Sequence, residues 1–387
     1  MGSKESTWLV TLAPVGVMLS VWMVQIFYYE IWGATIFNPV SITTWGVVAA
    51  GMFGYAMSAG ICSVLTPSIQ ERPVVYISSS FIYFKNICFV FACVVILKDL
   101  LLPVLYGASV SELRNQVLDE WVAGGIWPRI NAILLNGLCC FIILIISLMY
   151  EAKKRLSFFW ILLFACLCVA CFSRTLLLIG MSIILLRVLL QARNPIRMIL
   201  FALISFVCLF LVLAWLMKDK SPGNEAVTDV LVHHLQIYFF GGVSGLNYFV
   251  EMDAPKYNSL LTVPRFLQAI LPTGFDLPPS FFDFVETPGT LNVFTSMFPP
   301  YHDFGVLGVL SFFVLYGAVS TIACVKFVKT NKAIWQVIAG FFLYATTMTI
   351  FDDQFLRGLP VILILIFFAW IFDKIRAKCL DVTPSIG

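Results

Sequence analysis

Residues 130–150 read INAILLNGLCCFIILIISLMY, a stretch of 21 residues without a charged side chain. An α-helix rises about 1.5 Å per residue, so this stretch forms a rod of roughly 30 Å, the thickness of the hydrocarbon core of a bilayer. A segment this long and this apolar predicts a transmembrane helix.

The rest of the chain has the same apolar character. Of its 387 residues, 60% are apolar and 12% are charged, and the mean hydropathy is +0.96. A soluble domain carries about 25% charged residues, and a soluble protein of this size has no means of burying so much apolar surface. The composition also excludes a disordered chain. The net charge of +3 is too small and too spread out to indicate nucleic-acid binding.

We therefore predict an all-α polytopic membrane protein with about ten transmembrane helices. The first apolar segment is too long for a cleavable signal peptide. We expect about seven helices within residues 1–217, a long loop over 218–303, and about three helices within 304–387. The predicted spans are 8–28, 40–64, 74–102, 130–150, 156–172, 175–192, 198–217, 304–326, 333–350 and 358–372.

Basic residues set the predicted orientation. If the N-terminus is cytoplasmic, the short inner segments hold 14 of the 24 lysines and arginines, whereas the much longer outer segments hold nine. The positive-inside rule therefore predicts both termini in the cytoplasm and the long loop in the periplasm. Residues 231–250 are apolar enough for an eleventh span, but an extra crossing would place the lysines near residue 330 outside. Because the segment also carries His233 and His234, we expect a re-entrant or interfacial helix packed in protein.

A second outer loop, residues 103–129, predicts a helix that lies on the membrane surface. Ser109 and Glu112 have the spacing of a capping box, in which each side chain accepts a hydrogen bond from the other residue's backbone. Apolar residues follow on one helical face and end at Trp121, a suitable interface anchor.

Motifs for metal or nucleotide chemistry are absent from the sequence. There is no Walker loop, no H-E-x-x-H, no D-x-D pair and no Gly-x-Ser-x-Gly elbow. None of the 11 cysteines lies in the two long outer loops, so we interpret them as apolar filler within helices. We predict no metal site and no cofactor.

Charged side chains at membrane depth are candidates for function because burying them is costly. Lys85 lies within a predicted span, where it either reaches the interface or has a functional role. Arg174, at an outer turn and a helix start, suits either an anion site or an interface anchor. Arg265 is a further outer arginine near the bilayer, and for Arg129 and Arg357 contact with lipid phosphates is the favoured reading.

The segment before the eighth span concentrates polar groups. Asp303 is either the N-cap of that helix or a carboxylate placed where an outer ligand meets the membrane. His302 has the intrinsic pKa of a general base at neutral pH. Asp276, Asp283 and Glu286 are further candidates, although solvated loop acids are the simpler interpretation.

Three motifs lie between about residues 170 and 310: Asn292-Val-Phe-Thr295 with Tyr301-x-Asp303-Phe-Gly305-x-x-Gly308, Tyr238-Phe-Phe-Gly241-Gly242 with Leu246-Asn247, and Ser173-Arg174-Thr175. They resemble the motifs of bacterial O-antigen polymerases, the Wzy-type oligosaccharide repeat-unit polymerases. The resemblance covers about residues 170–310 by motif and the whole chain by topology.

The resemblance implies a GT-C-like glycosyltransferase of the bacterial inner membrane with a periplasmic site. It would transfer a glycan from undecaprenyl pyrophosphate to a lipid-linked repeat unit in the bilayer, alongside a chain-length regulator protein. Arg174 and Arg265 would bind the pyrophosphate, and His302 or Asp303 would accept the hydroxyl proton. The remaining motif residues expected at the substrate site are Tyr238, Asn292, Thr295 and Tyr301.

Two alternatives stay open. An O-antigen ligase has a similar long loop and arginines, and the motif pattern favours the polymerase. A flippase or transporter of lipid-linked sugars would line a path with charged residues on many helices, whereas here the polar groups gather on one side. The halves of the chain also lack the resemblance expected of inverted repeats.

Overall fold

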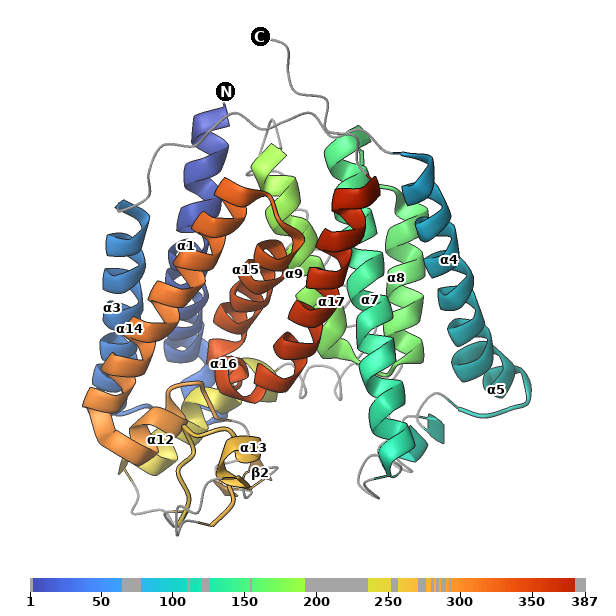
Figure 1. Cartoon of the computed structure of the whole chain (residues 1–387). Helices are drawn as coiled ribbons and strands as arrows, with labels where there is room; N and C mark the ends of the chain where they lie inside the picture. The colour runs from blue at the N-terminus through green and yellow to red at the C-terminus, as the bar shows by residue number, and fades with distance from the viewer. Residues whose placement is uncertain are drawn as a thin grey trace.

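The structure is a computed structural model, drawn in Figure 1 as a bundle of long helices. Within the residues it describes, the chain is helical apart from irregular connections and one antiparallel pair of short strands, β1 (Val285–Glu286) and β2 (Thr290–Leu291). The described residues are 3–64, 78–109, 112–113, 115–117, 119, 125–153, 155–191, 236–251, 257–270, 276–279, 282, 285–286, 290–291 and 294–379.

The chain is a polytopic α-helical membrane protein. Among the described residues, seven helical segments are long and apolar enough to cross a membrane: Trp8–Ile36, Ile42–Val64, Ser79–Leu105, Ile126–Ala152, Arg174–Gln191, Phe298–Thr330 and Ala333–Ile350. The segment Phe158–Ala170 is apolar but shorter. The predicted span at 198–217 lies outside the described residues, so the total of ten stays a prediction.

The long helices are often extended by short turns of a different pitch. In chain order the helical elements are α1 (Ser3–Tyr28), η1 (Tyr29–Gly33), α2 (Ala34–Ile36), α3 (Ile42–Val64), α4 (Ser79–Ile96), η2 (Leu97–Leu101), α5 (Leu102–Leu105), α7 (Ile126–Lys153), α8 (Phe158–Ala170), α9 (Arg174–Gln191), η3 (Ile237–Gly241), α12 (Gly242–Glu251), α13 (Arg265–Gln268), α14 (Phe298–Thr330), α15 (Ala333–Thr347), η4 (Met348–Ile350), α16 (Gln354–Arg357) and α17 (Leu359–Cys379). Helix α14 starts before the predicted boundary at residue 303.

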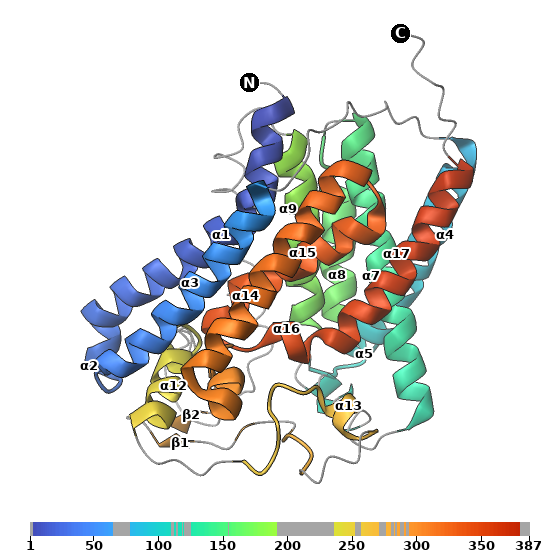
Figure 2. The same cartoon turned by 60° about the vertical axis from the view of Figure 1, so that its left-hand side comes forward.

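Small residues bring the longest helices into close contact. A Cβ atom on Gly317 of α14 would lie 2.4 Å from the carbonyl oxygen of Tyr55 in α3, and one on Gly54 would lie 2.8 Å from the oxygen of Leu310. Such close backbone approach is typical of helix pairs in membranes, where packing replaces the hydrophobic effect as the driving force. Figure 2 shows α3 and α14 running side by side.

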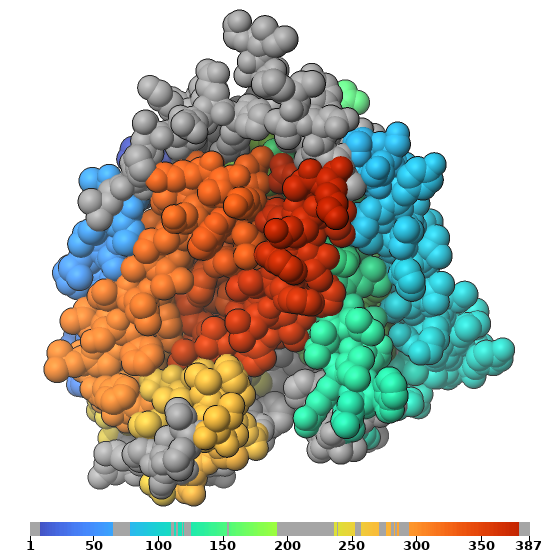
Figure 3. Space-filling model, in the orientation of Figure 1, coloured from blue at the N-terminus to red at the C-terminus, as the bar shows by residue number. Residues whose placement is uncertain are grey.

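The outer surface of the bundle is apolar. Leu315 of α14 is 55% exposed, Phe367 of α17 is 54% exposed and Phe91 of α4 is 61% exposed. Figure 3 shows one face of the molecule, where α14, α17, α7 and α4 form most of the surface. Apolar surface spread over several helices in this way is suited to contact with lipid rather than with water.

The two ends of the bundle differ. The first residues of α1 and the last residues of α17 lie at one end, which we call the terminal end, as the predicted topology requires (Figure 1). Helices α12, α13 and α16 lie at the opposite end, which we call the loop end (Figures 1 and 2).

At the terminal end, a buried ion network joins four helices. The carboxylate of Glu151 in α7 lies 3.3 Å from Arg187 of α9 and 3.4 Å from Arg376 of α17. Asn331, between α14 and α15, donates to Glu151 at 2.5 Å, and Gln336 accepts from Arg187 at 2.8 Å. The Arg187 side chain is only 2% exposed, so this arginine is an interior residue.

Capping residues fix the helix ends beside this network. Asn331 has a φ of 52°, and this left-handed conformation ends α14. The carboxylate of Asp373 in α17 accepts hydrogen bonds from the backbone N–H groups of Ala333 (2.9 Å) and Ile334 (3.1 Å), at the start of α15. The turn between the two helices is thereby tied to α17.

Candidate functional site

Motif segments that are far apart in the sequence meet at the loop end. A Cβ atom on Gly242 would lie 2.1 Å from the carbonyl oxygen of Ile350 and 3.4 Å from Cγ2 of Thr295. The N–H of Ser296 donates to the carbonyl oxygen of Thr349 at 2.9 Å. The glycine pair, the segment before α14 and the turn after α15 therefore form one packed junction that requires glycine at position 242.

The expected re-entrant segment is described only from residue 236, and His233 and His234 lie outside the described residues. Its described part is η3 followed by α12, which lies at the loop end (Figure 2). The side chain of Asn247 accepts from the N–H of Ser41 and the hydroxyl of Thr44, both at 2.9 Å. Asn247 thus satisfies donors at the start of α3, which have no partner within the helix.

Asp303 anchors a neighbouring loop. Its carboxylate accepts from the N–H of Leu261 (3.1 Å), from the N–H and hydroxyl of Thr262 (2.8 and 2.6 Å) and from Nδ1 of His302 (2.8 Å). Its side chain is 1% exposed. Of the two alternatives for Asp303, the N-cap of the eighth span is wrong, because α14 begins at Phe298 with prolines in its first turn, where they are favoured.

His302 completes the same anchor. Its Nε2 atom lies 3.1 Å from the backbone N–H of Tyr257. A backbone N–H can only donate, so Nε2 is the acceptor and the proton of the neutral ring is on Nδ1, facing Asp303. Both ring nitrogens are engaged and the side chain is 8% exposed. His302 and Asp303 together hold residues 257–262 against the start of α14.

Gly305 interrupts α14 directly after this anchor. Its φ of 64° and ψ of −154° belong to a region that is essentially restricted to glycine. No atom lies within 4 Å of a Cβ built there, so the backbone conformation, and not space, requires glycine. Residues 298–304 form a separate short helix that takes its own direction.

Arg174 is the first residue of α9, and a tight turn places it there. Phe172, with a φ of 50°, ends α8: its N–H donates to Val169, and the N–H of Ser173 donates to Cys168. The Ser173 hydroxyl then accepts from the N–H of Leu176 at 3.2 Å and caps α9. Arg174 is half-buried, and the adjacent Thr175 lies beside Tyr344 of α15.

The other predicted site residues are spread over the loop end. Arg265 is exposed at the first position of α13, Tyr301 is half-buried in α14, and Thr295 is fully buried. Tyr238 belongs to η3, but its side chain lies outside the described part of the chain, as do Asn292 and Asp283. The structure therefore brings Thr295 together with Gly242 of the glycine pair.

Asp352 and Asp353, two acidic residues that sequence reasoning missed, lie beside Arg357 in the turn between α15 and α17, which we call the Arg357 turn. Arg357 of α16 lies 3.2 and 3.3 Å from the two carboxylate oxygens of Asp352, and Gln354 donates to the same carboxylate at 2.9 Å. Asp353 is only 2% exposed and accepts from two backbone N–H groups of α16 and from the hydroxyl of Tyr316 in α14, at 3.4 Å. The signal in the sequence was the Asp-Asp-x-x-x-Arg pattern directly after an apolar span.

Burial and, to a smaller extent, the neighbouring charge of Asp352 raise the pKa of Asp353 to about 7. The two N–H groups of α16 and the guanidinium of Arg357 act in the opposite direction but do not offset this. Asp353 is therefore poised to gain or lose a proton near neutral pH.

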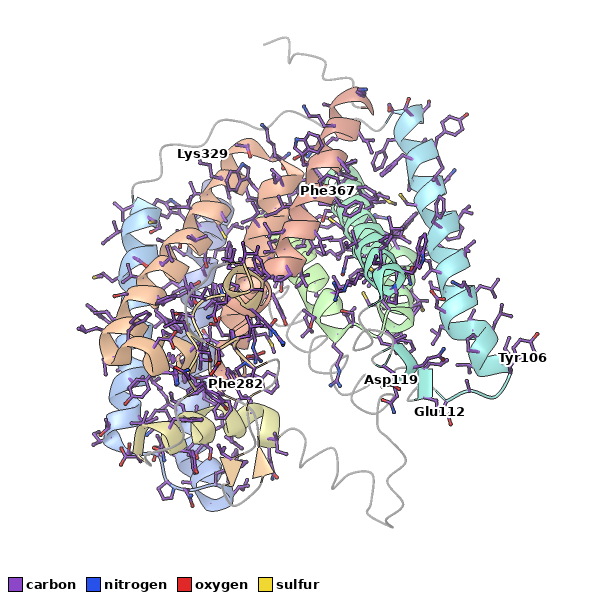
Figure 4. All side chains as sticks on the ribbon, turned by 60° about the horizontal axis from the view of Figure 1, so that its bottom comes forward. Tyr106, Glu112, Asp119, Phe282, Lys329 and Phe367 are labelled. Atoms are coloured by element: carbon purple, nitrogen blue, oxygen red, sulfur yellow. The ribbon has the colours of Figure 1, made fainter. Side chains whose placement is uncertain are left out.

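Aromatic rings connect this cluster to the Asp303 anchor. The guanidinium carbon of Arg357 lies 4.5 Å from the centre of the Phe282 ring. Figure 4 looks onto the loop end and labels Phe282 among the surrounding side chains. The same ring lies 5.9 Å from that of Tyr257 and 5.1 Å from that of Phe298, and both of these contact His302. The Arg357 turn and the His302–Asp303 pair thus belong to one region.

The remaining candidates have ordinary surroundings. The Lys85 ammonium lies 5.9 Å from the ring centre of Trp160, and Arg129 is exposed in the first turn of α7. Asp276 is exposed and accepts from the Asn258 amide at 3.2 Å. The nine cysteines described are free thiols, and no group of described side chains suits a metal ion.

The Ser109–Glu112 capping box forms as the spacing predicts. The N–H of Ser109 donates to Glu112 at 2.7 Å, and the N–H of Glu112 donates to Ser109 at 3.2 Å. Trp121 and much of the helix that follows lie outside the described residues.

Comparison with protein-family models, curated proteins and solved structures finds no match to this chain.

Proposed function

We propose that the protein is a glycosyltransferase that polymerises undecaprenyl-pyrophosphate-linked oligosaccharide repeat units into O-antigen or capsule chains, on the periplasmic face of the bacterial inner membrane. The observation that carries the proposal is the convergence of its motif segments. Gly242, Thr295 and the Asp303 anchor come from distant parts of the sequence and lie at one end of the bundle. A one-sided site suits an enzyme acting on lipid-linked substrates better than a path across the membrane.

In this proposal the hydroxyl oxygen of the acceptor sugar attacks the anomeric carbon of the donor glycan. The bond from that carbon to the pyrophosphate breaks, and the hydroxyl proton leaves to a base. Arginines stabilise the negative charge that develops on the departing pyrophosphate, a role for which we assign Arg174 and Arg265. We assign His302 and Asp303 a positioning role, because every polar atom of the pair is already hydrogen-bonded within the protein.

The test is a lipopolysaccharide gel from a strain that lacks the gene, with and without complementation. A polymerase deletion should leave lipid A core capped by a single repeat unit, because flipping and ligation continue. Complete loss of capped core would instead indicate a ligase or a flippase. If the ladder is unchanged, capsule should be assayed, and an unchanged capsule as well would refute the polymerase.

Point variants test the site itself. Arg174→Ala and Arg265→Ala should each abolish long chains while the protein remains in the membrane. Arg129→Ala, a loop-end arginine expected to contact lipid, is the matched control and should retain normal chains. Polymerisation should also persist in EDTA, since the leaving group drives the reaction; activity that is lost in EDTA and restored by a divalent ion would contradict the proposed chemistry.

A further inference from the structure

The Arg357 turn has an uneven set of charges. Two carboxyl groups, Asp352 and Asp353, share one guanidinium, that of Arg357. The titratable groups that act on Asp353 are Tyr316 from α14 and, from its own turn, Asp352 and Arg357; Tyr344 from α15 faces Asp352. With Asp353 protonated, Asp352 and Arg357 balance each other. With Asp353 ionised, the turn carries a net negative charge.

Exposure decreases stepwise into the protein along this cluster. The Arg357 side chain is 36% exposed and that of Asp352 is 19% exposed, whereas Asp353 is 2% exposed. Tyr316 lies behind Asp353, and its ring stacks on that of Phe355 at 4.0 Å with an interplanar angle of 3°. A ligand therefore meets the guanidinium first, and Asp353 acts on that ligand through charge and not through contact.

Tyr316 allows Asp353 to change its protonation state without losing a hydrogen bond. The phenol hydroxyl lies 3.4 Å from Oδ2 of Asp353 and donates to it when the carboxylate is ionised. When that oxygen carries a proton, the acid can donate to the phenol oxygen instead, since a hydroxyl is both donor and acceptor. The other oxygen, Oδ1, accepts from Phe355 and Leu356 in either state.

A second cationic residue lies near the same turn. Thr175 and Asp352 both lie close to Tyr344, and Arg174 directly precedes Thr175 at the start of α9. The first residues of α9 and the Arg357 turn therefore both lie near Tyr344. An anion that meets both arginines would be attracted when Asp353 is neutral and partly repelled when it is ionised.

We propose that Asp353 couples proton uptake to the binding of a diphosphate group at the Arg357 turn, so that the loop end takes up its anionic ligand together with one proton. This inference rests on the proposed function, which supplies the lipid diphosphate, and it deepens that function by making substrate binding depend on pH. Asp353 is a positioning residue in this scheme, because it acts through the charge around Arg357. By linkage, the affinity for the diphosphate falls as pH rises above that at which Asp353 ionises.

The experiment is calorimetric titration of the full-length protein in detergent with undecaprenyl diphosphate, from pH 5.5 to pH 8.5. At pH 7, buffers of different ionisation enthalpy report the number of protons taken up. The expected result for the native protein is net proton uptake and a Kd that rises up to about tenfold per pH unit above pH 7. Titration of the ligand's own phosphates is common to all variants and cancels in their comparison.

Asp353→Asn should remove the protein's share of the proton uptake and flatten the pH dependence of Kd. Tyr316→Phe should shift the midpoint of the pH dependence of Kd. Asp373→Asn, which alters an equivalent helix-capping aspartate at the terminal end, should behave like the native protein. Inorganic pyrophosphate is titrated in parallel. If both undecaprenyl diphosphate and inorganic pyrophosphate bind with proton uptake, the protein recognises the diphosphate group itself. If only undecaprenyl diphosphate binds with proton uptake, recognition also requires the lipid chain.

If the Kd of the native protein and the Kd of Asp353→Asn depend on pH in the same way, the inference is overturned and the proposed function still stands. Absence of lipid diphosphate binding at every pH would overturn both. If Asp353→Asn fails to fold, Tyr316→Phe decides: an unshifted midpoint refutes the role of the pair.

Discussion

The two ends of the bundle differ in the ratio of carboxyl to guanidinium groups in their charged clusters. At the terminal end, one carboxylate, Glu151, is held by two guanidinium groups and the Asn331 amide, and the Glu151–Arg187 pair at its centre is buried. At the loop end, two carboxyl groups share one partly exposed guanidinium. The first arrangement has a cation for its buried anion and is suited to holding helices together. The second has one guanidinium for two carboxyl groups and is suited to exchanging a proton. Charged residues therefore hold helices together at the terminal end and can change their protonation state at the loop end.

The largest expected effect is at the terminal end. Glu151→Gln removes the anion between Arg187 and Arg376 and leaves a buried guanidinium without its counter-charge. Breaking a buried ion pair from one side costs about 3–5 kcal/mol. We expect a large loss of thermal stability in detergent and of protein in the membrane, whereas the exposed-site control Asp276→Asn should behave like the native protein. A fully stable Glu151→Gln protein would show that the network does not hold the helices together.

The next effect is the pH dependence of stability at the loop end. The pKa of Asp353 is raised to about 7 in the folded protein. Its contribution to the free energy of unfolding is therefore fully present below about pH 4 and is lost as pH rises towards 7. A rise of about three pKa units corresponds to about 4 kcal/mol. The native melting temperature should fall between pH 4 and pH 7 and then level off, relative to Asp353→Asn. Parallel melting curves for the two proteins would contradict this assignment.

Asp303→Asn should have a smaller and more local effect. An amide offers one oxygen where the carboxylate offers two, so donors on Leu261 or Thr262 would face an NH2 group. An unsatisfied buried donor costs about 1–3 kcal/mol. Hydrogen exchange at Leu261 and Thr262 should accelerate while exchange in α15 stays unchanged. Unaltered exchange at both residues would show that the anchor is not needed.

The smallest expected effect is at Asn247. Replacement by Ala removes the acceptor for the Ser41 N–H and the Thr44 hydroxyl, and loss of a cap costs about 1 kcal/mol. The first turn of α3 should exchange its amide hydrogens faster, and overall stability should fall slightly. Asn247→Asp, which keeps an acceptor, should retain the slower exchange; equal exchange in both variants would rule out a capping role.

The sequence was most informative where a single local pattern decides the outcome. Long uncharged runs such as 130–150 predicted membrane helices, and the spacing of Ser109 and Glu112 predicted a capping box whose two hydrogen bonds are present. The depth of a side chain is set by helices distant in sequence and was not predictable. Asp353 was not singled out in the sequence, yet it is 2% exposed and lies within hydrogen-bonding distance of Tyr316, 37 residues earlier in the chain. For Asp303, the sequence left open a helix cap or a carboxylate that meets an outer ligand, and in the structure its carboxylate anchors a loop some 40 residues away.

Gly305 gives the loop end a mechanical property. The glycine separates the short helix 298–304 from the remainder of α14, while Asp303 and His302 tie residues 257–262 to that short helix. The backbone angles of Gly305 therefore set the direction of the short helix relative to the rest of α14, and the hydrogen bonds of Asp303 and His302 extend that direction to residues 257–262. Any change of these two angles would reorient both segments together.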